Sequence, residues 1–329
     1  MLSRHFLRSK VLQTIYAAQA DPTDIVVVEK NFKHNIQRLN DLGAIQVSAL
    51  VHFAEVAGIM MDEAQHKYRP TKEELNPNRR FPENVFLQRI ADNYDYRHIC
   101  EGAKVNWSGV EYDEVFRQAF MQLKQLQIYR EYIVTEPSFS NDQQFALKVF
   151  KFLMNQDSLL ELIYPQSLWW EDDFDQIAQY NFMMLKSLDE NMDESTTLPR
   201  MYDVRNEKDV EAYEFARNLM LVAIRHKEEV ADMVRKHLKG WEYERVAGMD
   251  LLLLNMAIGE LTECPSIPER VTIDEYIELS KEFSTERSKL FINGILDKLI
   301  IELRSAGRIM KTGRGLALPS YEQNWEEDE

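Results

Sequence analysis

Apolar residues recur at intervals of three and four along most of this chain, a spacing that predicts amphipathic α-helices. In a first helix expected from Ser3 to Ala20, the side chains of Leu7, Val11, Ile15 and Ala18 fall on one side and should face a core. Patterns that alternate as in strands are few, and 329 residues include only 11 Gly and 10 Pro. The predicted fold class is therefore all-α.

The stretch 271–304 carries the strongest helical pattern. Thr272 with Glu275 forms a capping box for one helix, and Ser284 can cap a second. Asn293-Gly294 falls inside the second helix, where Gly costs about 1 kcal/mol relative to Ala. We therefore expect a neighbouring helix or a ligand to approach the backbone closely at Gly294.

The same spacing predicts the other elements. Residues 24–42 and 45–68 are expected to form a helical hairpin that turns at Leu42-Gly43. Polar, acidic residues around Pro199, from 189 to 208, mark the best domain boundary. The remaining expected helices are 85–92, 109–134, 145–154, 209–225, 227–238 and a buried central helix over 242–262.

The net charge of −16 argues against a general nucleic-acid binder, because phosphate repels an acidic surface. The charge is nevertheless uneven. Residues 1–20 contain Arg4, Arg8 and Lys10 with no acid, and residues 304–314 contain four basic residues with no acid. If the fold brings these segments together, a local RNA site could form.

Motifs for other functions are missing from the sequence. We find no phosphate-binding Gly-rich loop and no nucleophile elbow, so we expect no enzyme, cofactor or small-molecule substrate. Glu63-x-x-His66 is half of a di-iron motif without its second half, so no metal is expected. No signal peptide or membrane-spanning apolar run is recognised, and two distant cysteines, Cys100 and Cys264, fit a reducing compartment, so a cytoplasmic protein without membrane contact is predicted.

Particular motifs resemble those of the NusB family of bacterial transcription antitermination factors, in the long form found in Bacteroidetes. They are IDEYIELSK (273–281), FINGILDK (291–298), RVAGMDLLLLNMAIGEL (245–261) and the first helix, LSRHFLRSKVLQTIYAAQ (2–19). The resemblance implies a NusB-like helical bundle made of residues 1–21 and a C-terminal domain, 205–305. Residues 22–200 would be a helical insertion, and residues 306–329 a flexible tail.

The resemblance also implies a function. Such a factor binds boxA RNA together with the ribosomal protein NusE and joins the RNA polymerase elongation complex with other Nus factors, chiefly on ribosomal RNA operons. The positions that match the family's RNA contacts are Arg4, His5, Arg8, Arg287, Lys289 and Phe291. The first helix has fewer arginines than is usual in the family, and Leu290 stands where many members have Lys.

Plainer interpretations of these residues stay open. The charged residues of the first helix could form a solvated helix end, and Phe291 could pack in the core. At the positions that match family contacts to NusE, Tyr16 could be a partly buried aromatic, and Asp250 could simply stabilise the start of its helix through the dipole. The alternative function is a helical protein–protein adaptor of the transcription machinery without RNA binding of its own.

An internal repeat is a further hypothesis, with a chance alignment of amphipathic helices as its alternative. Residues 145–188 resemble 215–257 at a constant offset. The matched positions are Phe174, Ile177, Ala178, Asn181 and Leu185 with Tyr243, Val246, Ala247, Asp250 and Leu254.

Overall fold

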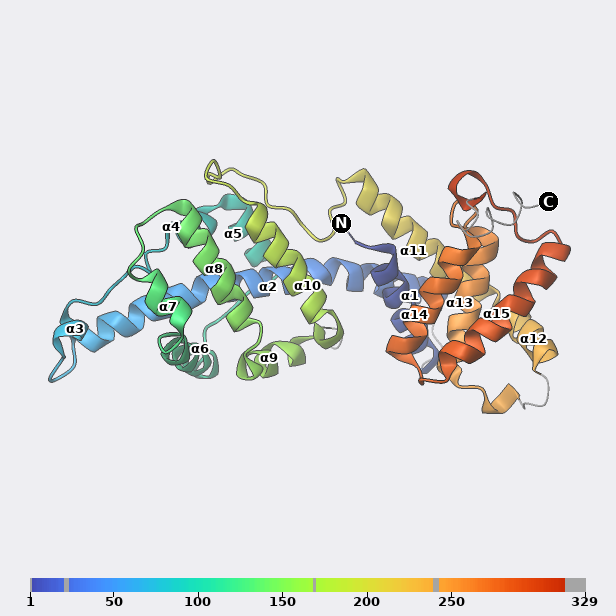
Figure 1. Ribbon diagram of the computed structural model, residues 1–329, viewed down its shortest axis with the longest axis horizontal. Coiled ribbons are helices and arrows are strands. Elements are labelled where there is room, and N and C mark those ends of the chain that lie inside the picture. The colour runs from blue at the N-terminus through green and yellow to red at the C-terminus, as the bar shows by residue number, and fades with distance from the viewer. Residues whose placement is uncertain (1, 21–23, 168–169, 239–242, 317–329) are drawn as a thin grey trace, which may run out of the picture. The chain divides into compact units, whose positions relative to one another are not determined.

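The computed structural model describes residues 2–20, 24–167, 170–238 and 243–316, and these ranges contain helices but no strand. The prediction of an all-α fold is confirmed. The α-helices are α1 (Arg4–Ala20), α2 (Ile25–Gln65), α3 (Lys72–Leu75), α4 (Val85–Asp92), α5 (Tyr94–Gly102), α6 (Val110–Leu123), α7 (Gln127–Tyr132), α8 (Phe139–Leu153), α9 (Asp157–Ile163), α10 (Trp170–Ser187), α11 (Glu207–Arg225), α12 (Lys227–His237), α13 (Gly248–Glu263), α14 (Glu269–Phe283) and α15 (Ser288–Ser305) (Figure 1). The short 3₁₀ helices are η1 (Tyr164–Gln166), η2 (Tyr243–Arg245) and η3 (Gly313–Leu316).

The chain divides into two compact units. Unit 1 comprises Met1–His34 and Asp203–Glu329, and unit 2 comprises Asn35–Tyr202. We expected an insertion that begins at residue 22, whereas this division falls within α2.

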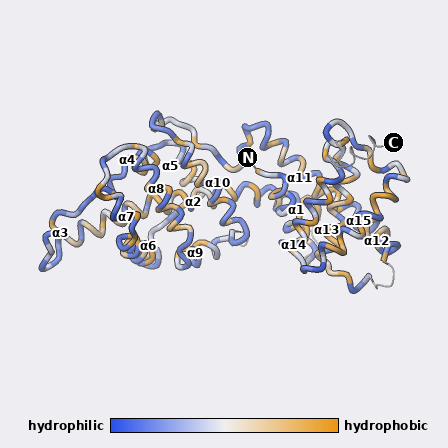
Figure 2. The backbone as a smooth tube through the Cα atoms, in the orientation of Figure 1, coloured by the Kyte–Doolittle hydropathy of each residue, from blue (hydrophilic) through white to orange (hydrophobic). Residues whose placement is uncertain are grey.

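Unit 1 is built around α13, which packs against α1, α11, α12, α14 and α15. Every residue from Leu252 to Leu261 is buried, as the almost uninterrupted apolar sequence requires. The hydrophobic run of this helix can be followed in Figure 2. Helix α1 is also enclosed, since Leu12, Ser9 and Thr14 are buried in addition to the predicted Leu7, Val11 and Ile15.

The helix ends in the signature stretch differ from the prediction. Helix α14 begins at Glu269 after Pro268, so Thr272 lies inside the helix, where its buried hydroxyl donates to Glu260 rather than capping a terminus. Ser284 ends α14, and α15 begins after Arg287. Tertiary hydrogen bonds have therefore displaced the local capping preferences.

The predicted hairpin at Leu42-Gly43 is wrong, because α2 runs without interruption through both residues. Gly43 lies against α10, where Asn181 donates from Nδ2 to the Gly43 carbonyl over 3.0 Å. The glycine thus serves helix packing instead of a turn. By length and composition α2 could cross a membrane, but 72% of its apolar window is buried, as in the core helix of a soluble protein.

Unit 2 has an aromatic core in which Phe53 and Phe81 lie edge to face, with ring centroids 5.5 Å apart. The helix expected over 109–134 is broken into α6 and α7. The break places Tyr132 on Phe145, with stacked rings whose centroids are 3.7 Å apart. The contact between Tyr132 and Phe145 of α8 therefore stabilises α7 although the predicted helix is interrupted.

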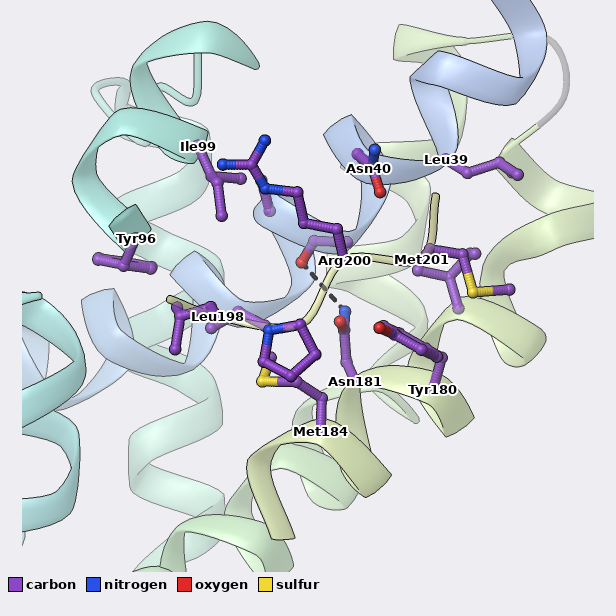
Figure 3. Close-up of a pocket in the computed structure, with 15 residues that line it drawn as sticks. Leu39, Asn40, Tyr96, Ile99, Tyr180, Asn181, Met184, Leu198, Arg200 and Met201 are labelled. Atoms are coloured by element: carbon purple, nitrogen blue, oxygen red, sulfur yellow. Dashed lines mark hydrogen bonds between the residues drawn. The ribbon is translucent and has the colours of Figure 1, made fainter. Parts of the chain in front are cut away.

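Residues 188–202 form an extended segment across unit 2 that is held by side chains of α4 and α5. Asn93 donates to the carbonyls of Asp193 and Thr196, and Asp95 accepts from the amide of Leu198 and from Arg200. The segment closes a cavity of about 40 Å³ between α2, α5 and α10 (Figure 3). Such a volume suits a water molecule or two rather than a substrate.

The tail predicted to be flexible makes hydrogen bonds to unit 1 within the described residues up to 316, and its flexibility stays a prediction. Thr312 donates its amide to the Pro265 carbonyl over 3.0 Å, and Lys311 donates to the Cys264 carbonyl over 3.1 Å. Residues 317–329 of the predicted tail, including its acidic end, lie outside the described residues. The internal repeat stays a prediction, with its matched positions in α10 on one side and, on the other, in η2, in α13 and in the two residues between them.

Candidate nucleic-acid and protein interface

Arg8 was predicted to contact RNA, but its side chain lies in the core of unit 1 and is 1% exposed. Its Nε and one terminal nitrogen each donate to a different carboxylate oxygen of Glu260 over 2.7 Å. The RNA contact expected of Arg8 is therefore corrected to an internal ion pair. The physical reason is Glu260, which is fully buried and needs a cation beside it.

The Arg8–Glu260 pair is the centre of a buried network. Thr272 donates to Glu260 over 2.9 Å, and the Tyr276 hydroxyl donates over 3.4 Å. Burial has the largest effect on Arg8 and would lower its pKa, but the hydrogen bond to Glu260 and the charges of Glu260, Tyr276 and Glu275 together raise the pKa of Arg8 overall. Burial, with the Glu260 charge, raises the pKa of Tyr276 well above its ordinary value. The network fixes α1 against α13 and α14.

His5 lies on the rim of this network and is shared by two carboxylates. Nδ1 is 2.8 Å from Glu275, and Nε2 is 3.1 Å from Glu282. Only the imidazolium form can donate from both nitrogens at once. Burial alone would lower the pKa of His5, but the hydrogen bonds to Glu275 and Glu282 raise it overall. The two carboxylates thus favour the protonated form of His5.

Arg4 is the exposed cation of the first helix. Its guanidinium lies 3.8 Å from Glu211 of α11, with both side chains open to solvent, and 5.2 Å from the ring centroid of Phe215. An exposed pair of this kind contributes little to stability and exchanges readily with other partners.

The basic segments at the two ends of the chain approach each other around Cys264. Burial raises the pKa of the Cys264 thiol to about 11, against the opposing charges of Lys311, Arg8 and Arg4. Lys311 is itself half-buried, and burial lowers its pKa. The fold therefore brings the two segments together, but it encloses much of their charge.

The start of α15 presents the remaining predicted RNA residues. Arg287 and Lys289 are exposed, and no carboxylate within the described ranges pairs with either. Phe291, one turn beyond Arg287, is half-buried. This end of α15 follows α14, whose last turn carries the Glu282 that contacts His5. Residues of α1 and α15 thus border the same end of α14.

Asp250 was predicted to contact NusE, but it is 5% exposed and its carboxylate is occupied internally. Ser284 donates to one oxygen over 2.6 Å, and Ser288 donates to the other over 3.0 Å. Because these serines bracket the loop before α15, the carboxylate holds in place the segment that carries Arg287. This correction replaces a partner contact by a positioning role.

Tyr16, the other predicted NusE contact, is 55% exposed near the end of α1. It lies eleven positions after His5 in the helix, so the two are about 16 Å apart along the axis. They belong to different ends of α1, and a partner at Tyr16 leaves the His5 end open.

A groove near the end of α1 was missed by the sequence prediction. It encloses about 220 Å³ and is lined by Gln19, by apolar residues of α12 such as Val234, and by Leu251 and Asn255 of α13. Asn255 is buried; its Nδ2 donates to the Ala223 carbonyl, but its Oδ1 has no hydrogen-bond partner in the structure. The apolar spacing in α12 indicated a buried face, whereas nothing in the sequence marks an unpaired amide.

The close approach predicted at Gly294 is wrong for the free protein. A methyl group placed on Gly294 would meet no atom within 4 Å in the described structure. Leu290, on the same side of α15, is 74% exposed. The glycine therefore lies on an open face.

The described residues contain no group of three or more His, Cys, Asp or Glu side chains placed to hold a metal ion. Unit 1 is thus a helical bundle of the all-α class, with exposed cations at the start of α15 and a groove beside α1.

Comparison with known proteins identifies the family. The NusB family model matches residues 174–300. The transcription antitermination protein NusB of Salinibacter ruber is 37% identical over 124 residues, which cover 38% of this chain and 78% of the relative. The proteins of the same name from Chloroherpeton thalassium and Myxococcus xanthus are 33% identical over 138 residues and 36% identical over 98 residues, covering 37% and 30% of this chain and 65% and 70% of the relatives. The chain belongs to the NusB family, as the resemblance predicted. No solved structure matches it.

Proposed function

We propose that this protein is a transcription antitermination factor that binds boxA RNA together with the ribosomal protein NusE. In this role it joins elongating RNA polymerase and other Nus factors in the cytoplasm, chiefly on ribosomal RNA operons, and it catalyses no reaction. The observation that carries the proposal is the pair of exposed cations, Arg287 and Lys289, inside the region matched to the family. Phosphate contacts of such cations supply affinity that falls with salt.

The first helix would add to this site by exchanging partners. Arg4 can leave Glu211 for a phosphate at little cost because the pair is exposed. His5 would have to leave Glu275 and Glu282, which also repel phosphate. Phe291 would supply stacking on an unpaired base. Cations of α15 would thus provide phosphate contacts that α1, with its few arginines, cannot provide.

The partner protein would bind at the other end of α1. Tyr16 offers an exposed aromatic ring, and the groove that Gln19 borders offers a largely apolar surface. Aromatic anchors beside an apolar pocket are typical of protein interfaces.

A helical adaptor without RNA binding is the second candidate. It is favoured by the carboxylates around the first helix, since Arg4, His5 and Arg8 each lie beside at least one of them. In that case the cations of α1 serve internal stability, and only protein partners bind unit 1.

The two candidates differ in salt-dependent RNA binding. We would measure fluorescence anisotropy of a labelled boxA RNA and a scrambled RNA over a range of salt concentrations. For Arg287→Gln/Lys289→Gln, we expect weaker binding and a salt slope reduced by about 1.4, because each single-strand phosphate contact contributes about 0.7.

The matched control is Lys30→Gln/Lys33→Gln, which removes two exposed cations of α2 in unit 1. It should leave affinity and slope unchanged. Equal binding to both RNAs, or the same loss in both double variants, would refute a boxA site at α15. RNA binding too weak to detect at low salt would favour the adaptor.

A further inference from the structure

Tyr68, in the turn between α2 and α3, is 94% exposed, more than any other large hydrophobic side chain in the described residues. Single exposed apolar residues are ordinary on protein surfaces. This ring, however, is followed by Arg69, whose guanidinium carbon lies 5.6 Å from the ring centroid. An open aromatic face next to a cation needs an explanation beyond chance exposure.

Hydrogen bonds to Glu74 form a clamp across the turn that carries Tyr68. The Glu74 carboxylate accepts from Lys67 Nζ over 2.7 Å and from the Thr71 amide over 2.8 Å, while the Glu74 amide bonds back to the Thr71 hydroxyl. The bonds to Lys67 and Thr71 lower the pKa of Glu74 to about 2, so its carboxylate is charged at neutral pH. Tyr68, Arg69 and the rigid Pro70 lie within the clamp. A ligand would therefore meet a preformed surface and order little of the chain.

The charge around this turn differs from that of the unit to which it belongs. Residues 35–202 carry 26 Asp and Glu against 16 Lys and Arg, whereas residues 66–80 carry five Lys and Arg against two Glu. Three of the five are neutralised: Lys67 by Glu74, Arg79 by Asp62 and Arg80 by Asp142.

The other two cations, Arg69 and Lys72, are exposed, and no acidic group of the described structure pairs with them. Both flank Tyr68 in the same turn. Glu73 of the same turn is also exposed, so residues 66–75, with three cations and two carboxylates, carry a net charge of +1 within an acidic unit. The turn therefore still favours anions.

We infer that the turn 66–75 is a contact site for single-stranded RNA, separate from the predicted site in unit 1. A base would stack on Tyr68, and Arg69 and Lys72 would bind the neighbouring phosphates. Aromatic rings with adjacent cations form the general platform for single strands, and the contact carries little sequence preference. The inference rests on the proposed function in one respect, namely that the ligand is the transcript on which the protein acts. The exposed cations Arg69 and Lys72 have no acidic partner among the described residues, and RNA phosphates would supply that negative charge. RNA is therefore favoured over a protein partner at this turn.

The test uses the full-length protein and a labelled run of uridines without a boxA sequence. We expect Tyr68→Ala to weaken binding roughly 5- to 150-fold, the range for loss of one stacked base. Tyr68→Phe, which keeps the stacking face, should bind like the unchanged protein. Arg69→Gln/Lys72→Gln should reduce the salt slope by about 1.4.

Matched controls come from the same unit. Tyr94→Ala removes another exposed aromatic ring, and Lys148→Gln/Lys186→Gln removes two exposed cations without acidic partners in the described residues. Neither should change binding to the uridine run. The inference is overturned if the unchanged protein does not bind this RNA at low salt, or if Tyr68→Ala binds it normally.

Two further outcomes separate the sites. Loss of RNA polymerase binding in Tyr68→Ala, with uridine binding unchanged, would identify a protein contact and overturn the RNA inference. Failure of boxA selectivity, with uridine binding still dependent on Tyr68, would refute the proposed function alone.

Discussion

At the scale of single residues, the ion pair between Arg8 and Glu260 decides how α1 is held in unit 1. Both groups are removed from water, so each depends on the other for compensation of its charge. Sequence could not reveal this pairing, because the two residues lie 252 positions apart. A buried arginine and an exposed one look alike in a sequence, and Arg8 was accordingly assigned to RNA.

Truncation of Arg8 should destabilise the protein strongly. We expect Arg8→Ala to lower the free energy of unfolding by about 3–5 kcal/mol, because it leaves the Glu260 carboxylate buried without a cation. Urea denaturation of the full chain measures the change. Arg4→Ala is the control and should stay within about 0.5 kcal/mol, since Arg4 is exposed. Equal stability of the two variants would show that Arg8 is not a core residue.

His5 should make the stability of α1 packing depend on pH. Its pKa in the folded protein is raised above the ordinary value of 6.5 by Glu275 and Glu282. The stabilisation is therefore fully present below pH 6.5 and is lost as the pH rises through the folded-state pKa. We expect the stability advantage over His5→Gln to shrink in this alkaline direction. NMR titration of the His5 ring gives the pKa, and a value at or below 6.5 would contradict the contacts with both carboxylates.

At the scale of helices, periodicity predicted the elements better than their ends. Helix α4 was predicted with its observed limits, and α11 and α12 within two residues of theirs. The errors arose where a distant contact overrides a local preference. Thr272 donates to Glu260 instead of capping α14, and Gly43 accepts from Asn181 within α2 instead of forming a turn.

The single substitution Gly294→Ala tests the stability of the protein and RNA binding by α15 in separate measurements. Gly294→Ala should raise the free energy of unfolding by about 0.5–1 kcal/mol, because alanine favours the helix and nothing lies within 4 Å of the added methyl group. Gly315→Ala is the contrasting variant and should destabilise, since its methyl group would clash with the Pro265 carbonyl oxygen. Thermal or urea denaturation compares the two.

The same Gly294→Ala protein tests whether a ligand uses the open face of α15. If RNA approaches this backbone closely, the variant should bind boxA RNA less tightly although it is more stable. Unchanged affinity would show that the face stays free in the complex.

At the scale of the whole molecule, family membership could be predicted because the signature motifs in α13, α14 and α15 are long and contiguous. The predicted sites fared differently. Exposure of Tyr16, Arg287 and Lys289 agrees with contact roles, whereas Arg8 and Asp250 turned out to hold the bundle together. Residues that match a family's contacts can be identified from sequence, but their accessibility depends on carboxylates and hydroxyls brought near by the fold.

The central claim is joint recognition of RNA by this protein and its ribosomal partner. The most direct measurement is fluorescence anisotropy of labelled boxA RNA against the full-length protein, with and without NusE from the same organism. We expect NusE to tighten binding to boxA RNA more than to a scrambled RNA, and Tyr16→Ala to abolish this gain while leaving binding without NusE unchanged. Binding that NusE does not alter, or that is equal for both RNAs, would contradict the proposed function.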